Sequence, residues 1–259
     1  MVIPSYDRNP ARRVPIVTWA LIVANIVVFV LSPLARAPFT SESTAQLCGQ
    51  QAFVYHWGAV PWELTRNQAL PFTVGPPAGR NACLTVKPTY HKYPALSSLT
   101  SLFLHAGWLN LLGNMVFLFL FGGTVEDRVG RVRYLLLYLL AGVVSTYIFA
   151  FTLGGSTLPL VGASGAIAGL LGAYLVKFPR AKAAGLMGFL YFLPGWLPAW
   201  TLLALWFGLQ AVYARGWGMT GGGGTAILVP VVGFVFGMIA AAVFVPRRQY
   251  GGYRQRRAY

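Results

Sequence analysis

Hydrophobic residues occur in six long runs, and shorter polar segments separate them. The runs cover about residues 14–34, 109–123, 134–153, 158–176, 186–212 and 226–245. An α-helix needs about 20 apolar residues to cross about 30 Å of hydrocarbon. Only the second run is clearly shorter than that, and its neighbours support its inclusion. The pattern therefore predicts an all-α polytopic membrane protein with six transmembrane helices.

Composition agrees with a membrane protein and excludes a soluble enzyme. Hydrophobic residues make up 56% of the chain and charged residues 10%, and the mean hydropathy is +0.61. We expect one membrane domain over residues 14–245, with a long extracytoplasmic loop at about 35–107 between the first two helices. Short cytoplasmic tails, 1–13 and the basic 246–259, flank this domain.

The net charge of +15 reflects where the cations lie along the chain. Three precede the first run, three follow the second, three follow the fourth and five follow the sixth, which places 14 of the 20 Lys and Arg on one face. The positive-inside rule then places both termini in the cytoplasm. We expect a multi-pass protein of the plasma (inner) membrane. The C-terminal arginines would bind anionic lipid headgroups at about 1 kcal/mol each. No nucleic-acid-binding fold accompanies the charge, so a nucleic-acid partner is not expected.

Both cysteines, Cys48 and Cys83, fall in the long loop between the first two runs. A disulfide between them would contribute about 3–4 kcal/mol by the chain-entropy model, and an extracytoplasmic face allows it to persist. Two free thiols are the alternative. No histidine pair accompanies the cysteines, so we expect no metal site, and nothing in the chain calls for a cofactor.

Glycines recur at helical intervals in the fourth and sixth runs. The residues are Gly162, Gly165, Gly169, Gly172, Gly233 and Gly237. Small residues at such spacing let two helix backbones approach closely within lipid, so we expect the two runs to be in contact. Ser164 lies among these glycines, and it can be interpreted either as one more small packing residue or as a nucleophile.

Several motifs together resemble the rhomboid family of intramembrane serine proteases. Residues 103–115 (FLHAGWLNLLGNM) resemble the entry to the second rhomboid helix, 125–130 (VEDRVG) the turn after it, and 162–165 (GASG) the nucleophile motif. Residues 206–210 (WFGLQ) and 231–237 (VVGFVFG) resemble the fifth and sixth helices. The motifs occur in the family's order, which implies the six-helix rhomboid fold.

The resemblance assigns roles to individual residues. It places Ser164 at the nucleophile position and Asn114 and Asn110 at the oxyanion-binding positions, where the family commonly has histidine in place of Asn110. Its base histidine lies on the sixth helix, two or three residues before the glycine matching Gly233, and Pro230 occupies that position. His105 matches a residue that organises the neighbouring loop, and the glycines match packing positions.

The catalytic apparatus implied by the resemblance is therefore incomplete. The chain has three histidines, His56, His91 and His105, and none lies in or near the sixth run. The family's aromatic support for the base is absent too, since Ala168 stands at its position. A serine hydroxyl needs an adjacent base to attack, and losing that base costs on the order of 10⁶ in kcat in a soluble serine protease.

We therefore expect a rhomboid-family protein that binds transmembrane segments of other membrane proteins without cleaving them. Ser164, Asn114 and Asn110 would form its polar pocket. The alternative is an active intramembrane serine endopeptidase with an unrecognised base, for which His105 is the candidate. A purely structural membrane scaffold is a third class that the sequence leaves open.

Overall fold

The computed structural model describes residues 14–36, 43–78, 82–179, 182–183, 197–216 and 225–244, and nearly all of its elements are helices. In chain order they are α1 Ile16–Leu31, η1 Pro33–Arg36, α2 Thr44–Trp57, α3 Pro61–Arg66, β1 Thr73–Pro77, β2 Cys83–Val86, α4 Pro94–Thr100, η2 Ser101–Phe103, α5 Trp108–Val129, α6 Arg131–Thr152, α7 Ser164–Lys177, β3 Lys182–Ala183, β4 Leu197–Pro198, α8 Ala199–Gly216, η3 Thr225–Ile227 and α9 Leu228–Phe244. Both predicted tails, and residues 186–196 of the fifth run, lie outside the described residues.

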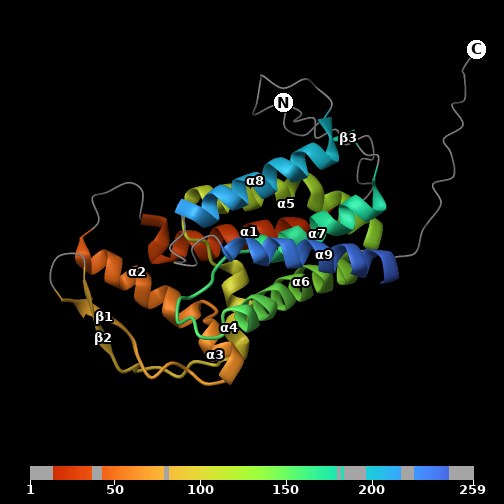
Figure 1. The fold of residues 1–259 in the computed structure, drawn as a ribbon. Helices are drawn as coiled ribbons and strands as arrows, with labels where there is room; N and C mark the ends of the chain where they lie inside the picture. The colour runs from red at the N-terminus through yellow and green to blue at the C-terminus, as the bar shows by residue number, and fades with distance from the viewer. Residues whose placement is uncertain are drawn as a thin grey trace, which may run out of the picture.

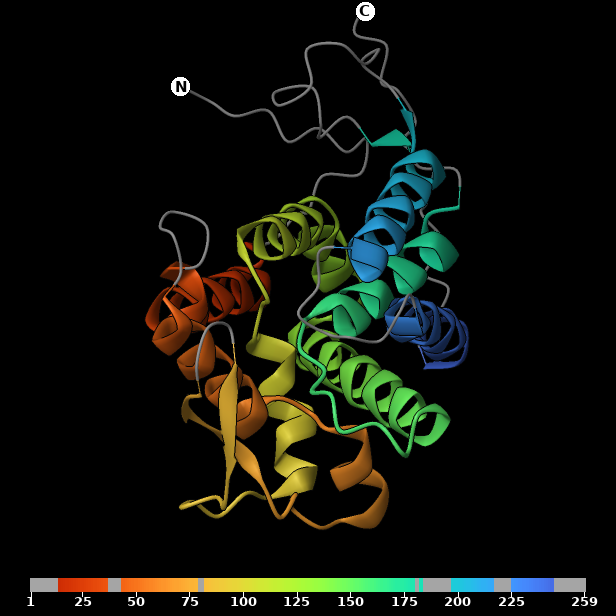
Figure 2. The same ribbon diagram turned by 60° about the vertical axis from the view of Figure 1, so that its left-hand side comes forward.

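Three helices in the described part of the chain are long and apolar enough to cross a membrane, Trp108–Val129, Arg131–Thr152 and Thr225–Phe244. Three shorter apolar helices, Ile16–Leu31, Ser164–Lys177 and Trp200–Val212, lie with them. Figures 1 and 2 show the segment from α2 to α4, with its hairpin, gathered at one end of the other helices. The protein is thus a mostly helical membrane protein.

Helix α5 is longer than the hydrophobic pattern predicts. We predicted that the helix ends at residue 123 and that a turn follows over 125–130. Both predictions are wrong, because the helix continues to Val129 and Gly130 is its C-cap. Glu126 and Asp127 therefore belong to the last turns of α5. The carboxylate of Glu126 ends the hydrophobic run without ending the helix.

Glu126 is buried because it caps another helix. One carboxylate oxygen accepts a hydrogen bond from the Val17 backbone N–H at 3.1 Å, and the other accepts from the Thr18 N–H and hydroxyl, both at 2.8 Å. These N–H groups belong to the first turn of α1, which has no acidic residue of its own. A helix N-terminus has unpaired donors and a positive dipole end. The carboxylate satisfies both and fixes α1 against α5.

The predicted contact between the fourth and sixth runs is confirmed, since α7 and α9 share the most extensive helix interface in the described part of the fold. Added β-carbons at Gly233 and Gly237 would collide with the backbone carbonyls of Gly165 and Gly169. Helices α7, α9 and α6 lie side by side in Figures 1 and 2. The glycines therefore bring two helix backbones into direct contact.

Helix α7 begins later than the pattern predicts. Its predicted start at residue 158 is wrong, because the helix starts at Ser164 and the preceding residues form a loop. Gly162 belongs to that loop and has a φ of +134°, which a residue with a β-carbon rarely adopts. It is therefore a turn residue, while Gly165, Gly169 and Gly172 form the packing face of the helix.

The segment between α1 and α5 is folded and cross-linked. Cys48 on α2 and Cys83 on β2 form a disulfide whose Cα atoms are 5.6 Å apart. Strands β1 and β2 pair antiparallel, with Thr73 opposite Val86, and the register shifts before Pro77 pairs with Cys83. Strand β1 also packs on α2. The disulfide thus fastens the outer strand of the hairpin to the helix that carries it.

Glycine packing yields a stability prediction. We expect Gly237→Ala to lower the free energy of unfolding by about 1–3 kcal/mol, because the new methyl group forces α9 away from α7. The matched control is Gly113→Ala on α5, where an added β-carbon meets nothing within 4 Å. That change should be neutral or stabilise by up to about 1 kcal/mol. Thermal denaturation in the same detergent measures both, and equal stability of the two variants would contradict the proposed close contact.

Candidate functional site

Ser164 is the first residue of α7, at the end of a loop that the rest of the fold holds in place. The loop enters through Gly162, whose backbone N–H donates to the Ser101 carbonyl at 3.0 Å. Ala163 is the N-cap and offers no side-chain hydrogen bond to the helix. Ser164 is half-buried, while residues 165–174 of α7 are buried. Its hydroxyl therefore lies at the edge of the helix core.

Ser164 and Asn110 converge on one side of Gly162. A β-carbon built on Gly162 would lie 3.8 Å from the Ser164 Oγ atom and 3.9 Å from the Asn110 Oδ1 atom. Asn110 belongs to the first turn of α5, and Asn114 follows one turn later on the same helix. The predicted nucleophile and the first predicted oxyanion residue thus come together, and Gly162 leaves the space between them open.

Unpaired polar atoms gather in this region. Asn114 is fully buried, and neither its Oδ1 nor its Nδ2 atom has a hydrogen-bond partner among the described residues. The Oδ1 atom of Asn110 is buried and unpaired as well. An unsatisfied buried polar group costs about 1–3 kcal/mol. These amides therefore keep hydrogen-bonding capacity that the described residues do not use, and a peptide group, with one donor and one acceptor, would match it.

His105 is buried in the turn between η2 and α5, with no exposed surface. Burial lowers the pKa of its imidazole to about 4, and the Phe103 backbone carbonyl has a smaller opposing effect. Neither ring nitrogen makes a hydrogen bond of normal geometry within the described structure. His105 is therefore neutral at pH 7 and is not hydrogen-bonded to Ser164.

Pro230 lies on the part of α9 that faces the start of α7. It is the third residue of α9 and is buried. The neighbouring Val229 and Gly233 both approach Gly165, the residue after Ser164: a β-carbon on Gly165 would lie 2.9 Å from Val229 Cγ1. The proline ring has no atom that can accept a proton. On α7, Ala168 is fully buried in the hydrophobic core.

The other two histidines belong to the segment between α1 and α5. His56 stacks on Trp57 and on Tyr90, with ring centroids 4.6 Å and 3.9 Å apart. Burial, and secondarily the charge of Lys92, lowers the pKa of His56. His91 is exposed and its ring lies near that of Tyr93. Neither histidine makes a hydrogen bond to Ser164 in the structure.

Sequence reasoning missed the contact between the loop before Ser164 and the segment between α1 and α5, which we call the outer segment after its predicted position. Ala59 and Leu160 exchange two backbone hydrogen bonds, of 3.0 Å and 2.7 Å. The Trp62 backbone N–H also donates to the Ser156 carbonyl at 3.0 Å. Backbone pairing of single residues leaves no signal in a hydrophobic pattern. Among the described residues, no group of three His, Cys, Asp or Glu side chains could hold a metal ion.

The buried His105 generates a pH prediction. Its pKa is about 4 in the folded protein and 6.5 when unperturbed, so the unfolded chain binds more protons between these values. The contribution of neutral His105 to the free energy of unfolding is fully present above pH 6.5 and is lost as the pH falls toward 4. When the pH falls from 7.5 to 5, the free energy of unfolding should therefore decrease in both proteins, but by about 2 kcal/mol less in His105→Gln than in wild type. The exposed His91→Gln is the control and should match wild type, and the same result for His105→Gln would contradict the burial argument.

Comparisons with known proteins agree with the motifs. Residues 95–247 match the family model described as the Rhomboid domain. RHOMBOID-like protein 1 of Arabidopsis thaliana is 29% identical over 252 residues, which cover 92% of this chain and 55% of that protein. Putative rhomboid protease YdcA of Bacillus subtilis (strain 168) is 42% identical over 84 residues, or 30% of this chain and 38% of the relative.

A third relative is similar over a shorter region. Presenilin-associated rhomboid-like protein A, mitochondrial, of Danio rerio is 37% identical over 93 residues, which cover 35% of this chain and 24% of that protein. The chain spans about half the length of the plant relative and less of the other two. The Rhomboid domain model nevertheless covers more than half of the 259 residues, and the chain belongs to the rhomboid family.

Proposed function

We propose that this protein binds transmembrane segments of other membrane proteins at the Ser164 site and does not cleave them. The observation that carries the proposal is the position of Pro230 on α9. It lies between Val229 and Gly233, which both approach Gly165, the residue after Ser164. The family's base histidine belongs at this position, and the chain has no histidine on α9. Ser164 is thus left without a proton acceptor from the helix that packs against it.

The chemistry of the remaining groups supports recognition over hydrolysis. A serine hydroxyl is a weak nucleophile unless a base removes its proton. An oxyanion site and binding without a base retain about 10³–10⁴ over the uncatalysed rate in a soluble protease. Within a membrane, water must also be delivered to the site. That residual rate would give little turnover.

The polar pocket would recognise an unpaired peptide group. Asn110 and Asn114 are amides that present donors and acceptors, and Ser164 adds a hydroxyl. A regular transmembrane helix satisfies its own backbone groups, whereas a helix interrupted by Gly or Pro does not. We therefore propose that the preferred partner is a transmembrane segment with a locally unwound stretch near the level of Asn110.

An active endopeptidase is the second candidate. The convergence of Ser164 and Asn110 on Gly162 favours it, and one relative is named a putative rhomboid protease. Such an enzyme needs a base other than a residue of α9, and His105 is the buried candidate. Its low pKa makes it a poor proton acceptor. It would also have to move to reach the serine.

The proposed arrangement in the membrane has six spans, α1, α5, α6, α7, α8 and α9, with both termini in the cytoplasm. The asymmetry of Lys and Arg supports this orientation. It places the membrane domain at 14–245, the segment containing Cys48 and Cys83 outside, and the basic tail 246–259 against anionic headgroups of a plasma membrane. Persistence of the disulfide is consistent with an oxidising compartment.

Reactivity of Ser164 tests the absence of cleavage. A fluorophosphonate should label wild-type protein no more than Ser164→Ala, and a single-span substrate reconstituted with the protein should stay intact. The physical reason is that the protonated hydroxyl attacks slowly without a base. Wild-type labelling that disappears in Ser164→Ala would contradict the proposal. If the labelling also disappears in His105→Gln, His105 is the substitute base.

The same reconstitution tests binding. A photocrosslinking residue replaces exposed Leu109, next to Asn110, and the probe is a single transmembrane helix carrying a Gly-Pro interruption. Crosslinks should form with this probe and fall when Asn110 and Asn114 are both replaced by Leu. A crosslinker at Leu135 on α6 is the control for random contact. Equal yields from Leu109 and Leu135 would argue against a binding site.

Restoring a base provides the complementary prediction. Pro230→His places an imidazole on the third residue of α9, where proline costs a helix little, and it should give Ser164-dependent labelling above wild type. Pro230→Ala is the matched control, because it restores the backbone N–H without a base and should stay unlabelled. Adding Ala168→Phe would supply the missing ring, but Ala168 is fully buried and overpacking costs about 1–3 kcal/mol. A folded, unlabelled Pro230→His protein would mean that residue 230 does not face Ser164.

A further inference from the structure

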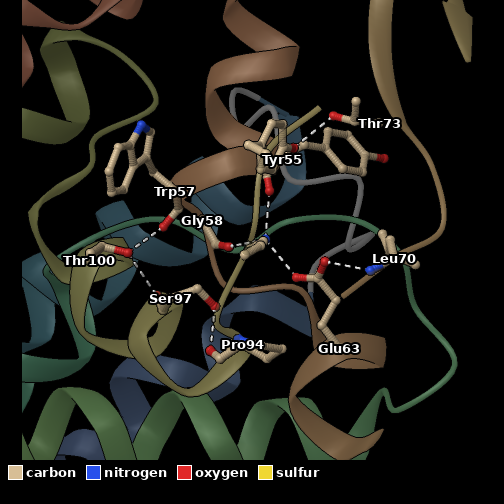
Figure 3. Close-up of polar contacts among 11 residues, drawn as sticks. Tyr55, Trp57, Gly58, Glu63, Leu70, Thr73, Pro94, Ser97 and Thr100 are labelled. Carbon is tan, nitrogen blue, oxygen red and sulfur yellow. Dashed lines mark hydrogen bonds and ion pairs between the residues drawn. The ribbon is translucent and has the colours of Figure 1, made fainter. Parts of the chain in front are cut away.

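Lys92 is a buried cation in the segment between α1 and α5, and it lies outside the candidate site. Its side chain is 4% exposed. Its ammonium contacts Glu63 Oε2 at 2.6 Å and donates to the carbonyls of Tyr55 at 2.6 Å and Gly58 at 2.9 Å. Figure 3 shows the Glu63 carboxylate and these two carbonyls directed toward one point. All three N–H bonds of the ammonium therefore have an acceptor.

Glu63 completes this arrangement from helix α3. Its side chain is 3% exposed, and its other oxygen accepts a hydrogen bond from the Leu70 backbone N–H at 2.9 Å. Burial lowers the pKa of Lys92, and the Glu63 carboxylate beside it acts in the opposite direction. Removing one member of such a pair leaves a buried, uncompensated charge. The pair thus fixes the end of α2, helix α3 and the chain before α4 to one another.

The carbonyl that Lys92 binds belongs to the residue before the contact with the Ser164 loop. Gly58 ends α2, and the next residue, Ala59, exchanges two backbone hydrogen bonds with Leu160. A β-carbon on Gly58 would lie 2.5 Å from the Val54 carbonyl oxygen and 3.2 Å from that of Leu160. The two segments of the chain therefore pack closely at Gly58, and the hydrogen bonds between Ala59 and Leu160 couple a shift of this turn to Leu160.

The loop is held from a second side by the chain that follows Lys92. Helix α4 begins two residues after Lys92, and the Thr100 hydroxyl at its end donates to the Trp57 carbonyl at 2.6 Å (Figure 3). The next residue, Ser101, accepts the hydrogen bond from the Gly162 backbone N–H at 3.0 Å. Both supports of residues 160–162 thus lead back to the region that Lys92 organises.

We infer that Lys92, with Glu63 as its counter-ion, is a positioning residue for the Ser164 site. It holds the Gly58 turn and the end of α4 so that Leu160 and Gly162 present Ser164 beside Asn110. The inference rests on the proposed use of the Ser164 site as the functional centre. It adds that the outer segment sets the geometry of that site, although the contacts of Lys92 and Glu63 within the described residues do not include Ser164.

The test measures the reactivity of a thiol at position 164. Both native cysteines are joined in the disulfide, so Ser164→Cys supplies the one free thiol. In lipid nanodiscs, adding Lys92→Met should raise its alkylation rate by a small maleimide by about tenfold, because a loosened loop opens more often. Glu63→Gln should raise it as well. Lys92→Met combined with Glu63→Leu should raise it less than Lys92→Met alone, since no unpaired charge remains.

A buried thiol on α6 separates positioning from general instability. Thr146 is 2% exposed, and Thr146→Cys in the Lys92→Met background should be alkylated no faster than in the otherwise wild-type protein. A rise at position 164 without a rise at position 146 supports the inference. Equal rises at both positions, or no rise at position 164, would overturn it.

The alkylation rates can be interpreted whether or not the protein binds transmembrane segments. Failure of crosslinking from Leu109 would remove the binding proposal and leave the alkylation result unchanged. If crosslinking succeeds, Lys92→Met should lower its yield as the alkylation rate of Ser164→Cys rises. A full crosslinking yield in Lys92→Met, together with an unchanged alkylation rate, would show that the outer segment does not position the site.

Discussion

The direct contact between the backbones of α7 and α9 is the constraint on which the rest of the fold depends. Lipid removes the hydrophobic drive that would hold two helices together in water, so close packing and backbone contact must replace it. Gly165 and Gly169 on one helix meet Gly233 and Gly237 on the other. This contact fixes which residues of α9 can face the start of α7, and it places Pro230 in that region.

Several buried polar groups in the described part of the chain complete a neighbouring element, and others beside Ser164 remain unpaired. Glu126 completes α1, and Lys92 completes the turn after α2. The side-chain amide of Asn114 and the Oδ1 atom of Asn110 are buried without partners in the described structure. Buried polar groups usually have partners, so these amide atoms are exceptions, as is the Trp206 Nε1 atom on α8.

Much of the helix arrangement could be predicted from the sequence, and the errors have identifiable physical causes. The hydrophobic runs located α1 and α5 to α9, and glycine spacing predicted the α7–α9 contact. Helices α2, α3 and α4 were missed, because they lie in the segment predicted as a long loop. The end of α5 was misplaced because a hydrophobic pattern cannot show that Glu126 is paired with α1. The start of α7 was misplaced because the apolar residues before Ser164 form a loop with a positive φ at Gly162.

The candidate site divides in the same way. Ser164, Asn110 and Pro230 were located by motifs whose order along the chain fixes their helices. The support beneath Ser164 could not be found, because it consists of backbone pairing between Ala59 and Leu160, which any residues can make. The strands of the β1–β2 hairpin gave no strand pattern, since β1 contains Gly75, Pro76 and Pro77 and β2 has only 4 residues.

The pairing of Ala59 with Leu160 also imposes an order on biogenesis. Residue 59 leaves the ribosome well before residue 160, and α5 and α6 lie between them in the chain. The disulfide links residues 35 positions apart and can close early, whereas the bridge to Leu160 must wait until both intervening helices have been synthesised. During that interval the backbone groups of Ala59 have no partner strand. Assembly of the outer segment therefore ends only when the loop before Ser164 arrives.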